Sequence, residues 1–124
     1  MAAAAAASIS IVLAGTAAAP SASAASGGGC SEGSIRSCIS YNGWLATVSA
    51  DSWYYPTPPA GCTHQTMIIN GNGNIVAEKY WDYCNSDRNP GVGYGTIGGD
   101  FYARTCFFLN NTVLACVDSP WQRV

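Results

Sequence analysis

Six cysteines constrain this chain more than any other feature of its sequence: Cys30, Cys38, Cys62, Cys84, Cys106 and Cys116. An even number of cysteines in a short exported chain is typical of a disulfide framework. No two of them have the C-x-x-C spacing, which argues against a zinc site or a thioredoxin-like redox centre. Three bridges at about 3 kcal/mol each would together match the net stability of a whole small domain. We therefore expect up to three disulfides and no metal.

The beginning of the chain predicts export. An apolar stretch at residues 9–13 is followed by small residues and by Ala22-Ser23-Ala24, which fits an A-x-A cleavage site. The apolar stretch is too short for a membrane-spanning helix. No Lys or Arg precedes it, so either the terminal amine supplies the positive charge or the true start lies upstream. Both alternatives predict a secreted protein with a signal peptide at residues 1–24, similar to the Ala-rich signals of high-GC bacteria.

The remaining residues predict one β-rich domain. Residues 25–29 are mostly glycine and are expected to form a flexible leader, and residues 30–124 a single disulfide-rich domain. Turn-forming residues recur about every 8 to 12 positions, and no segment keeps a helical period for three turns. The expected fold class is all-β, a small antiparallel β-sandwich or barrel of roughly six to eight short strands.

One hairpin is especially clear in the sequence. Residues 63–69 and 75–83 are joined by the Asn-Gly repeat of residues 70–74, which tolerates the left-handed backbone of a tight turn. Further strands are expected on both sides of Asn42-Gly43, at residues 52–55, at 101–109 and at 113–117. Residues 85–100 are rich in glycine, so we expect a connection there with one short strand near Tyr94.

The charge pattern limits the kinds of partner. Five basic and seven acidic residues give a net charge of −2, and the basic residues are scattered singly. A nucleic-acid partner needs a concentrated positive face, so none is expected. We also expect no cofactor, no membrane partner once the signal is removed, and a monomer. Aromatic residues are as frequent as charged ones, 11% against 10%, which suits aromatic contact with a partner.

No motif predicts catalytic residues. His64 is the only histidine, and no G-x-S-x-G motif accompanies it. A carboxylate pair for glycoside hydrolysis would have to come from Asp51, Glu78, Asp82 or Asp100. Any chain of this size holds as many acids, so their presence predicts little. The sequence therefore favours a binding protein over an enzyme.

Two aromatic groups are the candidate binding residues. Trp53, Tyr54 and Tyr55 precede a proline-rich segment and are the predicted target-binding residues. Neighbours in a strand face opposite sides, so Trp53 and Tyr55 share one face and Tyr54 the other. Two interpretations stay open: the three rings contact a partner, or Trp53 and Tyr55 are core and Tyr54 is exposed. Candidates for stacking on sugar rings are Tyr80, Trp81 and Trp121.

The segment Ser52-Trp53-Tyr54-Tyr55 is followed by six residues, the last of them Gly61, and then by a cysteine. This spacing resembles the tendamistat-type α-amylase inhibitors of actinomycetes, which present a Ser-Trp-Arg-Tyr segment before the same spacing. Tyr54 stands here in place of the arginine, which removes a charge-assisted contact with an acidic cleft. Weaker parallels follow at residues 90–91 and in the glycine-rich residues 94–98.

The resemblance also implies a pattern of bridges. It would pair Cys38 with Cys62 and Cys84 with Cys106, and would leave Cys30 and Cys116 to join the two ends of the domain. A nearest-neighbour pattern, 30 with 38, 62 with 84 and 106 with 116, stays open, because a sequence does not choose among pairings.

We expect a secreted binding protein, in the first place an inhibitor of an extracellular hydrolase such as α-amylase. The resemblance implies that Trp53, Tyr54 and Tyr55 enter the active site of the target. Bridges would fix their shape before binding, and Trp and Tyr often dominate such contacts. The alternatives are a carbohydrate-binding module that holds a polysaccharide, and a small accessory factor or enzyme of secondary metabolism.

Overall fold

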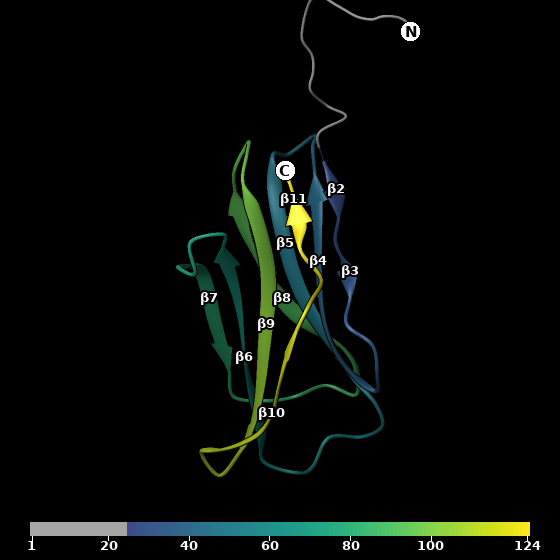
Figure 1. Cartoon of the computed structure of the whole chain (residues 1–124). Helices are drawn as coiled ribbons and strands as arrows, with labels where there is room; N and C mark the ends of the chain where they lie inside the picture. The colour runs from purple at the N-terminus through teal and green to yellow at the C-terminus, as the bar shows by residue number, and fades with distance from the viewer. Residues whose placement is uncertain (1–24) are drawn as a thin grey trace, which may run out of the picture.

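Residues 25–124, which the computed structural model describes, form two antiparallel β-sheets and no helix (Figure 1). The predicted all-β class is confirmed, and the predicted signal peptide lies outside the described residues. The strands are β2 (Ser26–Gly27), β3 (Gly29–Cys30), β4 (Ile35–Asn42), β5 (Thr47–Tyr54), β6 (Cys62–Asn70), β7 (Ile75–Trp81), β8 (Asp87–Gly95), β9 (Asp100–Leu109), β10 (Thr112–Asp118) and β11 (Gln122–Arg123).

The two sheets pack face to face as a β-sandwich. The four-stranded sheet has the order β3-β4-β5-β8, and the six-stranded sheet has the order β2-β11-β9-β6-β7. Strands β11 and β10 pair with the same edge of β9: β11 pairs with its first two residues, and β10 pairs with residues 104–109. Strand β9 is therefore central in its sheet, as β4 and β5 are in theirs.

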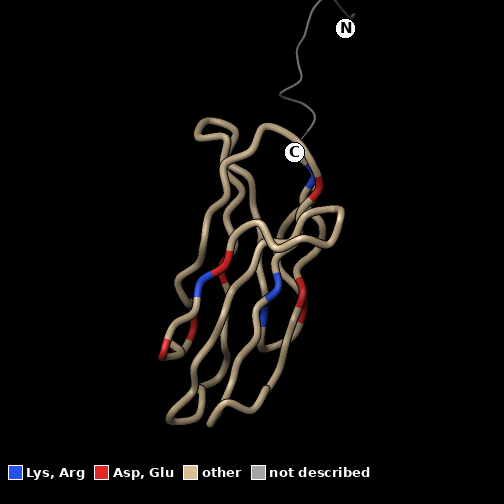
Figure 2. Tube along the Cα trace, turned by 90° about the vertical axis from the view of Figure 1, so that its left-hand side faces the viewer, with Lys and Arg blue, Asp and Glu red and all other residues tan. Residues whose placement is uncertain are grey.

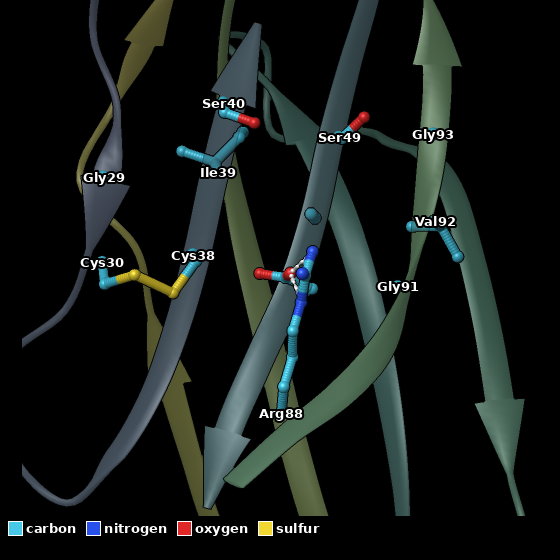
Figure 3. Close-up of a pocket in the computed structure, with 12 residues that line it drawn as sticks. Gly29, Cys30, Cys38, Ile39, Ser40, Ser49, Arg88, Gly91, Val92 and Gly93 are labelled. Atoms are coloured by element: carbon cyan, nitrogen blue, oxygen red, sulfur yellow. Dashed lines mark hydrogen bonds and ion pairs between the residues drawn. A yellow bond between two sulfur atoms is a disulfide. The ribbon is translucent and has the colours of Figure 1, made fainter.

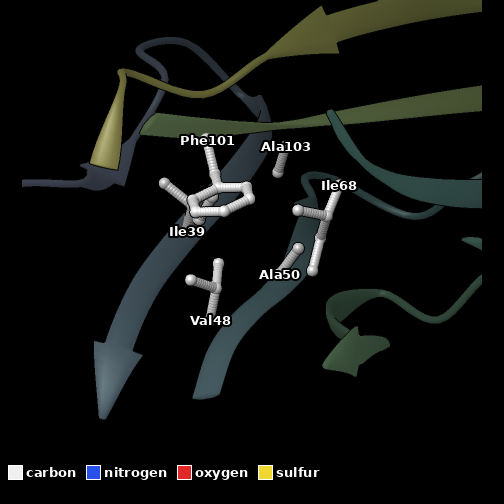
Figure 4. Close-up of a cluster of buried hydrophobic side chains, with 6 residues drawn as sticks. All are labelled: Ile39, Val48, Ala50, Ile68, Phe101 and Ala103. Carbon is white, nitrogen blue, oxygen red and sulfur yellow. The ribbon is translucent and has the colours of Figure 1, made fainter. Parts of the chain in front are cut away.

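The side chains between the sheets form three layers along the strands. The apolar layer consists of Ile39, Val48, Ala50, Ile68, Phe101 and Ala103 (Figure 4). The hydroxyl layer consists of Ser37, Ser52, Thr66 and Thr105, all fully buried. The aromatic layer consists of Tyr54, His64, Trp81 and Phe107. Every second residue of a strand faces inward, so each central strand passes through the layers in turn.

The hairpin predicted around residues 70–74 is confirmed. The side-chain oxygen of Asn70 accepts hydrogen bonds from the amides of Asn72 and Asn74, at 3.0 and 2.9 Å. Gly73 adopts a φ of 83°, which a residue with a side chain rarely adopts. Local turn chemistry therefore fixes this connection, and β6 pairs with β7 on either side of it.

Strand β8 corrects the prediction of a mainly irregular connection at residues 85–100. Nine residues, Asp87–Gly95, form an edge strand that pairs with β5. Pro90 is tolerated because it lies at an edge and beside a shift in register. Gly91 is required there, since a Cβ at this position would overlap the carbonyl oxygen of Ala50. The glycines that argued against a strand allow this close approach.

Part of the segment 25–29, expected as a flexible leader, also lies in strands: β2 covers Ser26–Gly27, and β3 begins at Gly29. Gly27 pairs with Gln122 of β11, and Gly29 pairs with Ile39 of β4. The side-chain amide of Gln122 donates a hydrogen bond of 3.0 Å to the carbonyl oxygen of Ser26. The N-terminal segment therefore closes both sheets on one side, although glycine itself provides no side chain for packing.

The bridges follow the nearest-neighbour pattern: Cys30–Cys38, Cys62–Cys84 and Cys106–Cys116. The pairing that the amylase-inhibitor resemblance implied is wrong. Cys30 and Cys38 are directly opposite in β3 and β4, and Cys106 and Cys116 are directly opposite in β9 and β10. Strand register, a property of the whole sheet, therefore selects the pairs. Three disulfides indicate an oxidising, extracellular environment.

Candidate functional site

The predicted target-binding residues divide between the two faces of β5. Tyr54 points into the sandwich, where its ring meets Phe107 edge-on with a centroid distance of 4.9 Å. Trp53 and Tyr55 lie stacked on each other, 6.0 Å apart and 14° from parallel. Trp53 is half-buried and Tyr55 is 39% exposed. Trp53 and Tyr55 are therefore the rings that lie outside the aromatic layer; we call them the aromatic pair.

A groove of about 510 Å³ runs along the outer face of the four-stranded sheet. Figure 3 shows the Cys30–Cys38 bridge on one side, Gly91 and Gly93 on the other, and Ser49 between them. Most of the side chains here are small, so the groove exists because the face has little to fill it. We call it the outer groove.

An ion pair lies within the outer groove, between the Cys30–Cys38 bridge and Gly91. The guanidinium of Arg88 contacts one carboxylate oxygen of Asp51 at 2.6 Å through Nη2 and at 2.7 Å through Nε. The Arg88 side chain remains largely exposed and extends over the strand that carries Ser49 (Figure 3). Its remaining N–H donors and the second carboxylate oxygen are available to hydrogen-bond a ligand.

Strand β5 connects the groove to the aromatic pair. Ser49, Asp51 and Trp53 alternate with buried residues, so they share the outer face. Trp53 lies directly opposite Arg88 of β8 in the register and two residues from Asp51 along β5. Hydroxyl, charged and aromatic groups therefore form one continuous strip along a single strand.

His64 occupies the inside of the sandwich and faces no solvent. Its ring stacks between Trp81 and Phe107, at centroid distances of 4.8 and 5.6 Å. Nδ1 donates a 2.6 Å hydrogen bond to the carbonyl oxygen of Tyr83, whereas the buried Nε2 has no partner. Burial lowers the pKa of His64 below 6.5, although the carbonyls of Tyr83 and Pro90 oppose this shift. The ring acts as a packed core group out of reach of a substrate.

The structure separates the three residues predicted to stack on sugars. Trp81 lies in the aromatic layer against His64. Tyr80 lies on the outer face of the six-stranded sheet near Phe108, with a centroid distance of 6.4 Å. Trp121 packs on Tyr102, 4.8 Å away, near the C-terminus. These three rings do not form a common platform.

Charged residues are sparse along the chain (Figure 2), and six of the twelve form ion pairs. Besides Asp51 with Arg88, Arg104 pairs with Asp118 at 2.7 Å and Arg123 with Asp100 at 3.5 Å. Within residues 25–124, no group of three or more His, Cys, Asp or Glu side chains is placed to hold a metal ion. No helix in this part of the chain is long and apolar enough to cross a membrane.

The sequence did not reveal the outer groove. Ser40, Ser49, Asp51 and Arg88 come from three strands, and each is unremarkable in its own segment. The only available signal was the high content of serine and glycine at alternate positions of the strands. That signal becomes a groove only when β4, β5 and β8 lie side by side.

The comparisons with known proteins found no match: no protein-family model, no curated protein and no solved structure matches this chain. The resemblance to the amylase inhibitors thus consists of the spacing from Ser52 to Cys62 and the weaker parallels after it.

Proposed function

We propose that this protein is a secreted, non-enzymatic binding protein that holds a carbohydrate chain on the outer face of its four-stranded sheet. The observation that carries the proposal is the position of the aromatic pair next to the outer groove. Trp53 and Tyr55 provide ring surface, and the groove provides room and polar groups along the same strand.

The chemistry of sugars matches this arrangement. A pyranose ring has apolar C–H faces, which stack on aromatic rings, and a rim of hydroxyls, which need donors and acceptors. The Asp51–Arg88 pair supplies both kinds of group, and the hydroxyls of Ser40 and Ser49 supply more. Small groove residues allow a chain to lie close to the backbone. The weak overall charge suits a neutral polymer.

Co-sedimentation with insoluble polysaccharides tests the proposal. The oxidised protein is incubated with cellulose, chitin, starch granules and xylan, and the bound fraction is measured. We expect binding to at least one polymer. Trp53→Ala should lower the affinity about tenfold, because a stacking contact of an aromatic ring is worth about 0.5 to 1.5 kcal/mol and about 1.4 kcal/mol corresponds to a factor of ten. Trp121→Ala is the matched control, since Trp121 is 52% exposed on the other sheet.

Two results would overturn the carbohydrate proposal. One is the absence of binding to every polymer and to a soluble glycan array. The other is binding that Trp53→Ala and Trp121→Ala weaken equally. Both variants are first compared with the parent protein by near-ultraviolet circular dichroism, so that loss of fold is recognised.

Inhibition of an extracellular hydrolase is the second candidate. Tyr55 leads into an exposed proline-rich loop at residues 56–61, and the Cys62–Cys84 bridge ties the end of this loop to the domain. An exposed aromatic on a restrained loop loses little entropy on binding a protein. Titration against an animal α-amylase tests this: stoichiometric loss of activity that Tyr55→Ala relieves would support inhibition, and full residual activity would exclude this target.

A further inference from the structure

Three apolar side chains protrude at one end of the sandwich. Trp44 is 95% exposed, Leu45 is 67% exposed and Ile97 is 90% exposed. Trp44 and Leu45 belong to the loop between β4 and β5, and Ile97 belongs to the loop between β8 and β9. Both loops lie at the upper end of the molecule in Figure 1. We call these three side chains the apolar tip.

The two loops form one structural unit. The amide of Thr96 donates a 2.8 Å hydrogen bond to the carbonyl oxygen of Ala46, which joins one loop to the other. The hydroxyl of Thr96 donates a 2.7 Å bond to the carbonyl of Gly98. Trp44, Leu45 and Ile97 are therefore carried on adjacent backbones, at the same end of the domain.

Hydrogen bonds within the β4–β5 loop hold its apolar side chains outward. The side-chain oxygen of Asn42 accepts bonds from the amides of Trp44 and Leu45, at 3.0 and 3.2 Å. The hydroxyl of Thr47 donates a 2.9 Å bond to the carbonyl of Leu45. The amides of Trp44 and Leu45 and the carbonyl of Leu45 are thus already paired. Such pairing is what an apolar medium requires, because an unpaired backbone group there is costly.

The two loops of the apolar tip contain no charged side chain. Residues 37–50 and 89–99, which contain both loops, include no Asp, Glu, Lys or Arg. The nearest charged side chains on the adjoining strands are Asp100 and Arg123, which pair with each other at 3.5 Å. In Figure 2 a blue and a red segment lie beside the C-terminus, and the other charged residues lie farther down the molecule.

The size and shape of the apolar tip indicate what it contacts. Each of the three side chains can bury no more than about 250 Å² of its surface. Together they bury less than the ~800 Å² that each partner buries in a typical stable protein interface. A second copy of this chain therefore finds too little area here. The protruding shape needs a soft medium that closes around it, and Trp is favoured where water meets lipid.

We propose that the apolar tip inserts into the interfacial region of a lipid bilayer, so that the domain lies on a membrane surface without spanning it. This departs from the sequence-based expectation of no membrane partner. Insertion needs no anionic lipid, because no basic side chain surrounds the tip. Trp44 is the main anchor, since it has the largest exposed apolar surface.

Vesicle co-sedimentation tests the proposal directly. The oxidised chain from residue 25 onward contains every described strand and bridge, and it is used so that the apolar N-terminal segment cannot itself bind lipid. The probes are vesicles of phosphatidylcholine alone and of phosphatidylcholine with phosphatidylserine. We expect equal binding to both, unchanged between about 50 and about 500 mM salt. We expect at least about a tenfold loss of partitioning for Trp44→Ala.

Matched variants separate the apolar tip from other surfaces. Trp121→Ala and Trp53→Ala should bind vesicles like the parent protein, and the latter also separates this proposal from the carbohydrate site. Ile97→Ser should weaken partitioning into vesicles less than Trp44→Ala does. The double variant should show the sum of the two losses in binding free energy. Failure of the parent protein to bind either vesicle overturns the proposal, as does full binding by Trp44→Ala. Self-association that Trp44→Ala abolishes, seen by sedimentation equilibrium, would replace the bilayer by a second copy.

Discussion

The apolar layer and the hydroxyl layer are neighbours in the same sandwich but are stabilised in different ways. In the apolar layer, Ile68, Phe101 and Ala103 face Ile39, Val48 and Ala50 across the gap between the sheets. In the hydroxyl layer, Ser37 of β4 meets Thr105 of β9 at an oxygen–oxygen distance of 3.2 Å, and Thr105 also meets Thr66 at 3.3 Å. The hydroxyl of Ser52, in the same layer, has no partner.

The two layers differ because apolar contacts are not directional, whereas hydrogen bonds depend on direction. Apolar contacts stabilise in proportion to the area that they bury and tolerate small displacements. A buried hydroxyl contributes only when a partner lies at the right distance and angle, and it destabilises otherwise. The Ser37–Thr105 bond therefore helps to set how β4 lies over β9, whereas the apolar layer stabilises the sandwich through the area that it buries.

The largest expected effect comes from truncating the apolar layer. Phe101→Ala should lower the free energy of unfolding by about 3 to 5 kcal/mol, because a large side chain leaves a cavity that its neighbours fill only in part. Denaturant unfolding of the oxidised protein measures this loss. Phe108→Ala, a half-buried position on the outer face, is the control and should cost less. An equal cost at both positions would contradict the assignment of the main core.

A smaller loss is expected in the hydroxyl layer. Thr105→Val removes the common partner of Ser37 and Thr66, and should cost about 1 to 3 kcal/mol because two buried hydroxyls lose a hydrogen bond. Changing all three residues, with Ser37→Ala and Thr66→Val added, should recover most of the loss. If the triple variant were instead less stable than Thr105→Val, the layer would be stabilised by shape and not by hydrogen bonds.

Acidification should weaken the aromatic layer through His64. Burial lowers the pKa of this ring in the folded protein below its usual 6.5, so the unfolded chain binds the proton more readily. The free energy of unfolding is therefore undiminished well above pH 6.5, and it declines as the pH falls from 6.5 toward the lowered pKa of folded His64. Thermal unfolding from about pH 8 to about pH 5 measures the decline. His64→Phe should remove most of it, and an unchanged slope would assign the effect to other groups.

Ser52→Ala should have the smallest effect. The Ser52 hydroxyl is buried without a partner, so its removal should leave the free energy of unfolding within about 0.5 kcal/mol of the parent value or raise it slightly. The same unfolding experiment measures this change. A loss comparable to that of Thr105→Val would show that Ser52 has a hydrogen-bond partner in solution.

Sequence reasoning was most successful where the cause of structure is local. The Asn-Gly repeat at residues 70–74 sets its own turn through the Asn70 side chain, and the hairpin around it was predicted. The prediction failed for β8, because Pro90 and Gly91 disfavour a strand locally and only pairing with β5 overrides this. For the aromatic pair, alternation placed Trp53 and Tyr55 on one face but did not show which face is buried.

The sequence by itself determined an all-β domain with disulfides, because alternation, turn residues and cysteine count are properties of neighbouring residues. The tertiary structure decided the disulfide pairs, the inward position of Tyr54, the outer groove and the apolar tip. Each of these depends on how strands distant in sequence pair and on which face of a sheet is covered. Pairing minimises the free energy of the whole chain, so no short segment contains that information.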